Sequence, residues 1–213
     1  GRQNSLLSFT SSPMTLENIC CTDSNAVRIR FSQAPDPAGL TDASLYSVDN
    51  GIGTPSAVAL SDEAGYEADL VFADRLLPGI LYRLDISGLR DCTGEEITAT
   101  FSGKFSQPQV CEAFDLVFNE ILFSPLSDGA EYIELYNRSE KTVSLDGLLL
   151  AQIRESPPNP PDTQFYEISE NCRSVLPDGY AVLTRYPEKV SGSFFAPEQK
   201  ASATDNSLAV LYF

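Results

Sequence analysis

The sequence predicts an all-β protein with two β-sandwiches in series and almost no helix, and three observations lead to this prediction. Apolar and polar residues alternate with a period of two in stretches spread along the chain. No stretch keeps a helical period over the roughly ten residues needed to define a helix. The length of 213 residues exceeds one average domain and is enough for two small β domains, each with its own core.

The first sandwich is predicted over residues 1–108. Val27, Ile29 and Phe31 alternate with arginines, which indicates a strand with one buried and one solvated face. The same alternation predicts further strands within residues 66–72, 80–87 and 97–101. Clusters of Asp, Asn, Gly and Pro between these segments are typical of turns.

A Pro78-Gly79 bend shortly before Tyr82 resembles the tyrosine corner of immunoglobulin-like and fibronectin-type sandwiches. In that motif the phenol bonds back to the backbone, so the resemblance implies a structural role for Tyr82. Residues 5–105 as a whole resemble a bacterial Ig-like domain. The segments that carry this resemblance are Phe31-Ser32-Gln33-Ala34-Pro35-Asp36 and Gly88-Leu89-Arg90-Asp91-Cys92-Thr93-Gly94.

Residues 106–114 have neither alternation nor a turn pair and are predicted to be a linker leading into a second module, residues 109–213. The segments 116–123 and 128–137 resemble the opening of a lamin tail domain, which reads Ile-Asn-Glu-Ile and then Glu-aromatic-Ile-Glu-Leu-x-Asn. Segments 143–148 and 176–184 resemble later strands of that family, with Leu148 where Trp is usual. The resemblance implies an Ig fold and structural roles for Glu120, Glu131, Glu134 and Asn137.

Together the resemblances predict two immunoglobulin-like β-sandwiches in series, as in large envelope-associated proteins of Bacteroidetes-type bacteria. They imply a non-catalytic structural, adhesion or interaction module of a larger cell-envelope or secreted protein. The expected location is extracytoplasmic, that is periplasmic, cell-surface or secreted, and the expected partner is a cell-envelope protein or a glycan. The alternative is a glycan-binding or carboxylate-dependent glycan-hydrolysing accessory domain.

Composition argues against several functions. Lys and Arg number 14 and Asp and Glu number 30, so the formal charge of −16 repels a phosphate backbone, and nucleic acid is not an expected partner. No apolar stretch approaches the roughly 20 residues of a membrane helix, so membrane insertion is not expected. The chain has no His and no Trp, which removes imidazole-based catalysis and the side chain most used to stack on sugars.

Paired carboxylates are the first catalytic candidates, and their spacing argues against catalysis. Glu131 and Glu134 are an odd number of residues apart on one predicted strand and point to opposite faces. Glu120 shares a face with Phe118 and Leu122, which favours a carboxylate satisfied by backbone donors or at a sheet edge. We therefore predict that the chain is not an enzyme, with a carboxylate glycosidase as the rival.

No cofactor is expected, and calcium is the alternative that the sequence leaves open because its oxygen ligands need no His. The best loops are residues 61–65 and 126–129. Neither has the Asp-x-Asp-x-Asp-Gly spacing of a calcium loop, which favours solvated hairpin turns.

The five cysteines, Cys20, Cys21, Cys92, Cys111 and Cys172, are too scattered for a paired-cysteine metal site. We favour cross-linking in an oxidising compartment over five inert thiols in a cytosolic protein. The first and last strands of an Ig sandwich end at the same pole, so the candidate disulfide joins Cys111 to Cys20 or Cys21. The pairing of Cys92 and Cys172 is left unassigned.

Three further segments of the sequence allow a structural or chemical interpretation. Residues 154–163 contain four Pro in five positions, which predicts a stiff polyproline rod or surface loop. Asn137-Arg138-Ser139 fits a eukaryotic glycosylation sequon, which carries no information in a bacterial protein. The apolar run 207–213 ends the chain without a turn or polar tail, which predicts a truncated sandwich with an unpaired edge open to self-association.

Overall fold

The computed structural model describes residues 13–125, 129–168, 172–184, 186, 189 and 207–212, with the backbone alone at Ser156 and at 207–212. Most of these residues belong to antiparallel sheets, and the described helices are one short turn each, α1 (Pro37–Leu40) and the 3-10 turn η1 (Ala43–Leu45). Each turn begins at an aspartate whose side chain accepts a backbone N–H, Asp36 from Gly39 and Asp42 from Ser44.

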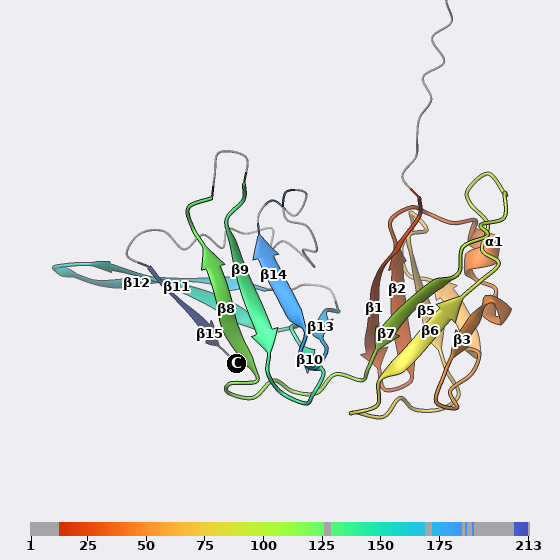
Figure 1. Ribbon diagram of the computed structural model, residues 1–213, viewed down its shortest axis with the longest axis horizontal. Helices are drawn as coiled ribbons and strands as arrows, with labels where there is room; N and C mark the ends of the chain where they lie inside the picture. The colour runs from red at the N-terminus through yellow and green to blue at the C-terminus, as the bar shows by residue number, and fades with distance from the viewer. Residues whose placement is uncertain are drawn as a thin grey trace, which may run out of the picture.

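Two sheets form the N-terminal half and lie close together (Figure 1). One has the order β1-β2-β5-β4 and contains β1 (Leu16–Asp23), β2 (Ala26–Phe31), β5 (Glu67–Val71) and β4 (Ala57–Leu60). The other has the order β3-β6-β7 and contains β3 (Tyr46–Val48), β6 (Tyr82–Ile86) and β7 (Phe101–Phe105). Buried side chains of both sheets form one cluster, the N-terminal core, which includes Phe31, Phe72 and Phe101.

The predicted strand at 97–101 is wrong, because β7 covers Phe101–Phe105 instead. The Ile97 N–H donates to the Leu89 carbonyl at 2.8 Å, and Arg90 forms an isolated bridge with Glu96. These contacts hold residues 89–97 together as a loop. Phe101 and Phe105 are the inward-facing residues of the strand that follows.

Three sheets form the C-terminal half. One has the order β14-β9-β8 and contains β8 (Leu116–Leu122), β9 (Tyr132–Asn137) and β14 (Tyr180–Thr184). A two-stranded sheet joins β10 (Val143–Ser144) to β13 (Ser174–Val175). The third has the order β12-β11-β15 and contains β12 (Asn159–Glu167), β11 (Leu149–Ser156) and β15 (Ser207–Tyr212). A second buried cluster, the C-terminal core, includes Leu135, Leu145 and Leu183.

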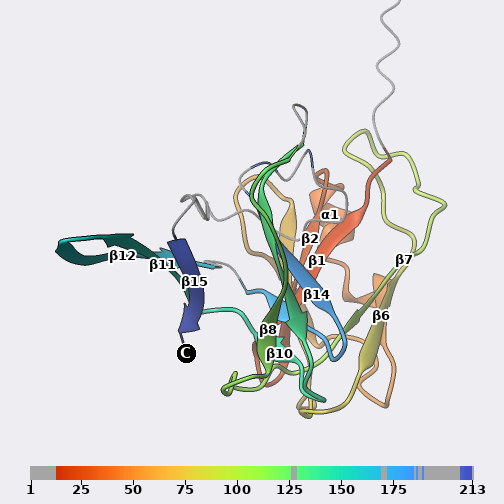
Figure 2. The ribbon, with the colours of Figure 1, turned by 60° about the vertical axis from the view of Figure 1, so that its left-hand side comes forward.

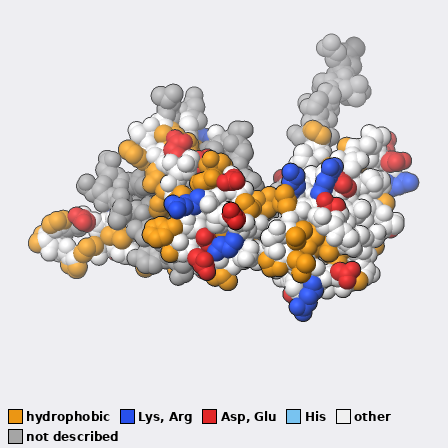
Figure 3. Space-filling model, turned by 60° about the horizontal axis from the view of Figure 1, so that its bottom comes forward, with side chains coloured by type: hydrophobic (Ala, Val, Ile, Leu, Met, Phe, Trp, Pro, Cys, Tyr) orange, Lys and Arg blue, Asp and Glu red, His pale blue; other side chains and the backbone are white. Residues whose placement is uncertain are grey.

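The proline-rich segment is not a polyproline rod or a loop. Strands β11 and β12 pair from Leu149 opposite Glu167 to Ser156 opposite Asn159, and the Pro157-Pro158 bond at their turn is cis. This hairpin projects from the body of the protein (Figure 2) and exposes hydrophobic atoms along its length (Figure 3). Pairing with β11 supplies hydrogen bonds that a polyproline helix lacks, which explains why the extended segment joins a sheet.

The fold prediction is confirmed at the level of a mostly β protein made of antiparallel sheets. The arrangement as two immunoglobulin-like sandwiches, and the boundary between residues 108 and 109, stay predictions. Strand β15 is an edge strand among the described residues, since it pairs with β11 alone.

Candidate functional site: the groove at the junction of the two halves

A groove of about 430 Å³ lies where the N-terminal and C-terminal halves meet. One wall comes from residues 16–19 of β1 and 102–105 of β7. The other comes from residues 173–176 and 179–181, with Leu145 between them. We call this space the junction groove, and its volume lies within the range of ligand pockets, about 300–1,000 Å³.

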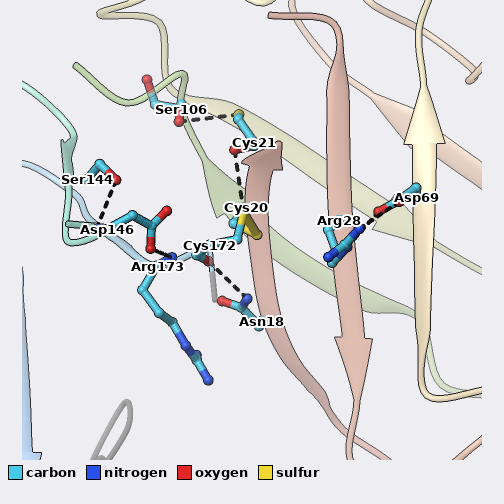
Figure 4. The surroundings of a disulfide bond; sticks show 10 residues. All are labelled: Asn18, Cys20, Cys21, Arg28, Asp69, Ser106, Ser144, Asp146, Cys172 and Arg173. Carbon is cyan, nitrogen blue, oxygen red and sulfur yellow. Dashed lines mark hydrogen bonds and ion pairs between the residues drawn. A yellow bond between two sulfur atoms is a disulfide. The ribbon is translucent and has the colours of Figure 1, made fainter. Parts of the chain in front are cut away.

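A disulfide beside the junction groove joins the two halves (Figure 4). Cys20 on β1 is bonded to Cys172, which lies just before β13 and 152 residues away in sequence. The two Cα atoms are 5.7 Å apart, within the usual range for a disulfide. Cys20 is only 2% exposed, and Cys172 is half-buried.

The predicted pairing of Cys111 with Cys20 or Cys21 is therefore corrected, because Cys20 is bonded to Cys172 and Cys21 and Cys111 are free thiols. Successive side chains of a strand point to opposite faces, so Cys21 faces away from Cys20. Its thiol donates to the Ser106 carbonyl at 3.5 Å, and burial raises its pKa to about 12. Burial, with the nearby Asp115 carboxylate, also raises the pKa of Cys111 to about 11.

Polar contacts fix the backbone around Cys172 from both halves (Figure 4). The Asn18 side-chain amide of β1 donates to the Cys172 carbonyl at 3.4 Å. On the other side, the Arg173 N–H donates to Asp146 Oδ1 at 3.3 Å, and the Asp146 N–H donates to Ser144 Oγ at 3.2 Å. Cys172 Sγ also lies 3.4 Å from the Cys21 carbonyl oxygen, a contact without a proton because the sulfur is in a disulfide.

The Arg173 side chain lines the junction groove and is half-buried. Among the described residues, no hydrogen bond or ion pair is made by its guanidinium group. Burial lowers the pKa of Arg173, and the positive charge of Arg30 lowers it further. Arg30 itself is paired, with Glu67 at 2.7 Å and with Glu17 at 3.5 Å. The groove is therefore lined by two cations without an ion pair in the part of the chain described, the half-buried Arg173 and the exposed Lys104.

Strand edges also border the groove. β7 is the outer strand of its sheet and β14 is the outer strand of its own, and both contribute to the lining. In an antiparallel pair, alternate backbone N–H and C=O groups point away from the partner strand. In the described sheets, β7 and β14 thus each present such groups on the side away from β6 and β9, respectively.

The predicted carboxylates lie outside this groove. Glu120 and Glu134 are register partners on β8 and β9, so their side chains share a face. Asn119 Nδ2 donates to Glu134 Oε1 at 2.6 Å, and a hydrogen bond with Glu120 raises the pKa of Tyr132. Glu131 lies one residue before β9, where its carbonyl accepts the Thr184 hydroxyl at 2.7 Å. The structure thus brings Glu120 and Glu134 together on an outer sheet face.

Asn137 is fully buried and connects three backbone segments. Its amide nitrogen lies within hydrogen-bond distance of the carbonyls of Lys141, Val175 and Leu176, at 2.7, 2.9 and 3.1 Å. Its oxygen accepts the N–H and the hydroxyl of Ser139 at 3.0 and 2.7 Å. A side-chain nitrogen held in this way is inaccessible, so the sequon cannot be glycosylated in the folded protein.

The remaining residues singled out by the sequence are Tyr82 and the two loops considered for calcium, residues 61–65 and 126–129. Tyr82 is buried, and its hydroxyl accepts the Leu77 N–H at 2.9 Å. Asp62 accepts the backbone N–H groups of Tyr66 and Glu67 at 3.2 and 2.9 Å, which closes the turn between β4 and β5. Residues 126–128 of the other loop lie outside the described residues. In the described chain, His, Cys, Asp and Glu side chains form no group of three or more suited to a metal ion.

The signal that could have revealed this site was weak. Arg173 and Cys172 stand in a segment without alternation, and neither belongs to a motif.

The described helices include none long and apolar enough to cross a membrane.

No protein-family model matches the chain, and no curated protein is recognisably similar in sequence. Among solved structures, the N-terminal part of the bacterial S-layer protein SbsC is similar over 85% of this chain and 43% of its own, with 18% identity and a TM-score of 0.40. The MG0-NIE-MG1 part of Escherichia coli alpha-2-macroglobulin is similar over 95% of this chain and 71% of its own, with 12% identity and a TM-score of 0.36.

This chain spans less than half of that SbsC structure. TM-scores below 0.5 at such identities carry no conclusion about function. The likeness to lamin tail and bacterial Ig-like families stays a prediction from the sequence motifs.

Proposed function

We propose that this chain is a non-catalytic, extracytoplasmic structural and interaction module of a larger cell-envelope or secreted protein. The observation that carries the proposal is the Cys20–Cys172 disulfide, which ties β1 of the N-terminal half to the segment before β13 of the C-terminal half. Structural disulfides form and persist in oxidising compartments and are rare in the cytosol. The bond fixes two β-rich halves side by side, as a spacer or binding module requires.

The polar contacts around the bond support the same proposal. Asn18 donates to the Cys172 carbonyl, so the junction is held by a hydrogen bond in addition to the covalent link. The cysteines left free are poor nucleophiles where they are buried, since burial raises the pKa of both Cys21 and Cys111. A thiol-based activity is therefore not part of the proposal.

The experiment compares compartments. We expect non-reducing peptide mapping of the protein isolated from its own host to find Cys20 linked to Cys172, and Cys21, Cys92 and Cys111 alkylated by a thiol reagent added after denaturation. We also expect a membrane-impermeant label or added protease to reach the protein in intact or outer-membrane-permeabilised cells. Recovery of the protein in the cytosol with Cys20 and Cys172 reduced would overturn the proposal.

Carboxylate-dependent glycan hydrolysis is the rival, and one observation keeps it testable. Glu120 and Glu134 face the same side as register partners, the kind of proximity that a retaining glycosidase needs between its two carboxyl groups. Against it, Glu120 is exposed and Glu134 is bonded to Asn119 outside the groove. We expect a screen of bacterial and host glycans to find no turnover. Hydrolysis that Glu120→Gln and Glu134→Gln abolish, while Glu140→Gln leaves it intact, would replace the proposal.

A further inference from the structure

The junction groove combines three features that a binding site for an extended peptide needs. Its walls are mostly apolar, with Leu16, Ile19 and Phe105 on one side and Val175 and Leu176 on the other. Strand edges of β7 and β14 border it, and an extended chain can pair with such an edge. One half-buried guanidinium, that of Arg173, stands in it.

The charge balance at the groove identifies the chemistry of the occupant. Glu17 also lines the groove, and its carboxylate lies 3.5 Å from Arg30, which is paired more closely with Glu67 at 2.7 Å. The exposed Lys104 lines the groove as well and adds a second positive charge. Asp146 accepts the backbone N–H of Arg173 at 3.3 Å, and no contact of its carboxylate with the guanidinium is present in the described residues. A partly desolvated guanidinium without a partner is costly and gains most from a carboxylate, which it binds in a bidentate manner.

We propose that the junction groove binds an extended, acidic peptide segment of a partner protein. In this arrangement the backbone of the segment pairs with the outer edge of β14 or β7, and an Asp or Glu side chain contacts Arg173. Apolar residues flanking the acidic one pack against the walls. The proposal names a partner class for the module and so rests on the proposed function.

The disulfide supports this inference because it keeps the groove formed before the peptide arrives. Cys20 lies one residue beyond the β1 segment that lines the groove, and Cys172 lies one residue before Arg173. The bond therefore holds both walls at a fixed separation. A preformed site avoids the cost of ordering its two halves on binding.

The test uses the purified, oxidised chain and an array of randomised hexapeptides that are acetylated and amidated, so that every carboxylate belongs to a side chain. We expect the bound peptides to be enriched in Asp or Glu flanked by Val, Ile or Thr. For the best peptide, Arg173→Gln should weaken binding at least tenfold and Arg173→Lys should weaken it less. Arg138→Gln, an exposed arginine away from the groove, is the matched control and should leave the affinity unchanged.

Two further measurements separate the parts of the proposal. Two versions of the peptide are compared, one N-methylated at its odd-numbered amides and one at its even-numbered amides. Only one of them should bind more weakly, because only one of the two sets of N–H groups pairs with a strand edge. The melting temperature of Arg173→Gln should not fall below that of the parent, which shows that lost binding is not lost folding. The proposal would be overturned if Arg173→Gln bound the peptide as tightly as the parent does, or if the bound peptides were not enriched in acidic residues. It would also be overturned if acetate, at the same concentration as the peptide, displaced the peptide completely. These outcomes leave the compartment experiment above unaffected, so the two proposals fail separately.

Discussion

The two halves of the molecule bury different chemistry. The N-terminal core contains the aromatic side chains of Phe31, Tyr46, Phe72, Tyr82, Phe101 and Phe105. In the described chain, the fully buried members of the C-terminal core are all aliphatic, and it encloses the amide of Asn137. Large rings bury the most apolar area per residue, whereas a buried amide must keep every hydrogen bond. The C-terminal half therefore depends more heavily on single polar contacts.

The charged pairs across neighbouring strands also favour the N-terminal half over the C-terminal half. In the N-terminal sheet, β2 and β5 place Arg28 opposite Asp69 and Arg30 opposite Glu67, so opposite charges face each other. In the C-terminal sheet, β8 and β9 place Glu120 opposite Glu134, so like charges do. Opposite charges across strands stabilise a sheet by a few tenths of a kcal/mol, and like charges weaken it by a similar amount.

Removing the link between the halves should have the largest effect. For Cys20→Ser combined with Cys172→Ser, we expect the free energy of unfolding to fall by about 2–5 kcal/mol, because a long covalent loop is no longer closed in the unfolded chain. Calorimetry should then resolve separate transitions for the two halves, with the C-terminal one at lower temperature.

Cys92→Ser is the control for this substitution, since Cys92 is an exposed free thiol. It should leave the thermogram unchanged. Identical thermograms for the parent protein and the double variant would mean that the bond does not couple the halves.

The next largest effect is expected inside the C-terminal core. Asn137→Ala removes the donor to three carbonyls and the acceptor for Ser139 at a fully buried position. Buried groups left without partners cost about 1–3 kcal/mol each, partly recovered by relaxation, so we expect a loss of about 2–4 kcal/mol. Urea unfolding followed by circular dichroism measures this loss. A change below 1 kcal/mol would remove the contrast between the halves.

Tyr82→Phe is the matching change in the N-terminal core, and it should cost less. The hydroxyl accepts one bond, from the Leu77 N–H, and Leu77 is 57% exposed, so water can replace the lost acceptor. The ring and its stacking on Phe105 remain. We expect a loss of about 0.5–1.5 kcal/mol in the same urea experiment. A loss as large as that of Asn137→Ala would show that the tyrosine contact is as essential as the buried amide.

Local patterns predicted much of the strand content, because burial of alternate residues acts within one strand. Strands β2, β5 and β6 fall where period two predicts them, and their inward residues are those of the apolar face. The segment 97–101 shows the limit of this method. Ile97 alternates correctly, but its backbone bonds to Leu89 in a loop, a long-range contact that periodicity does not report.

The junction groove could not be predicted from local patterns, because it also depends on contacts between residues far apart in the sequence. Cys20 meets Cys172 across 152 residues, and which cysteine it meets depends on how the two halves lie side by side. The expected partner, Cys111, follows from the topology of one sandwich considered alone. Arg173 became notable through its groove neighbours from β1 and β7, which its own sequence surroundings do not reveal.

The charge contrast between the sheets predicts two small effects of opposite sign. Glu120→Gln removes a like-charge pair while leaving an acceptor for Tyr132, so stability should rise by a few tenths of a kcal/mol. Asp69→Asn removes the two-point contact with Arg28, at 2.7 and 2.8 Å, and should lower stability by about 0.5 kcal/mol. Both effects should shrink in 1 M salt, as urea titrations at two salt concentrations can test. Effects of the same sign would contradict the contrast.

The smallest expected effect is a difference in pH dependence. In the N-terminal half, the Thr93 hydroxyl and backbone N–H groups donate to the Asp91 carboxylate and lower its pKa from 3.8. A lowered folded-state pKa adds stability that is present above the unfolded pKa and is lost as the pH falls through the folded one. In the C-terminal half, Asp115 and then Glu112 raise the pKa of Lys141 from 10.5, so its contribution is present below that value and is lost as the pH rises through the folded-state pKa. We expect Asp91→Asn to reduce the fall in melting temperature below about pH 4, and Lys141→Gln to reduce the fall above about pH 10.5. Melting curves of the three proteins across the pH range measure this, and parallel curves for parent and variants would show that neither contact is linked to folding.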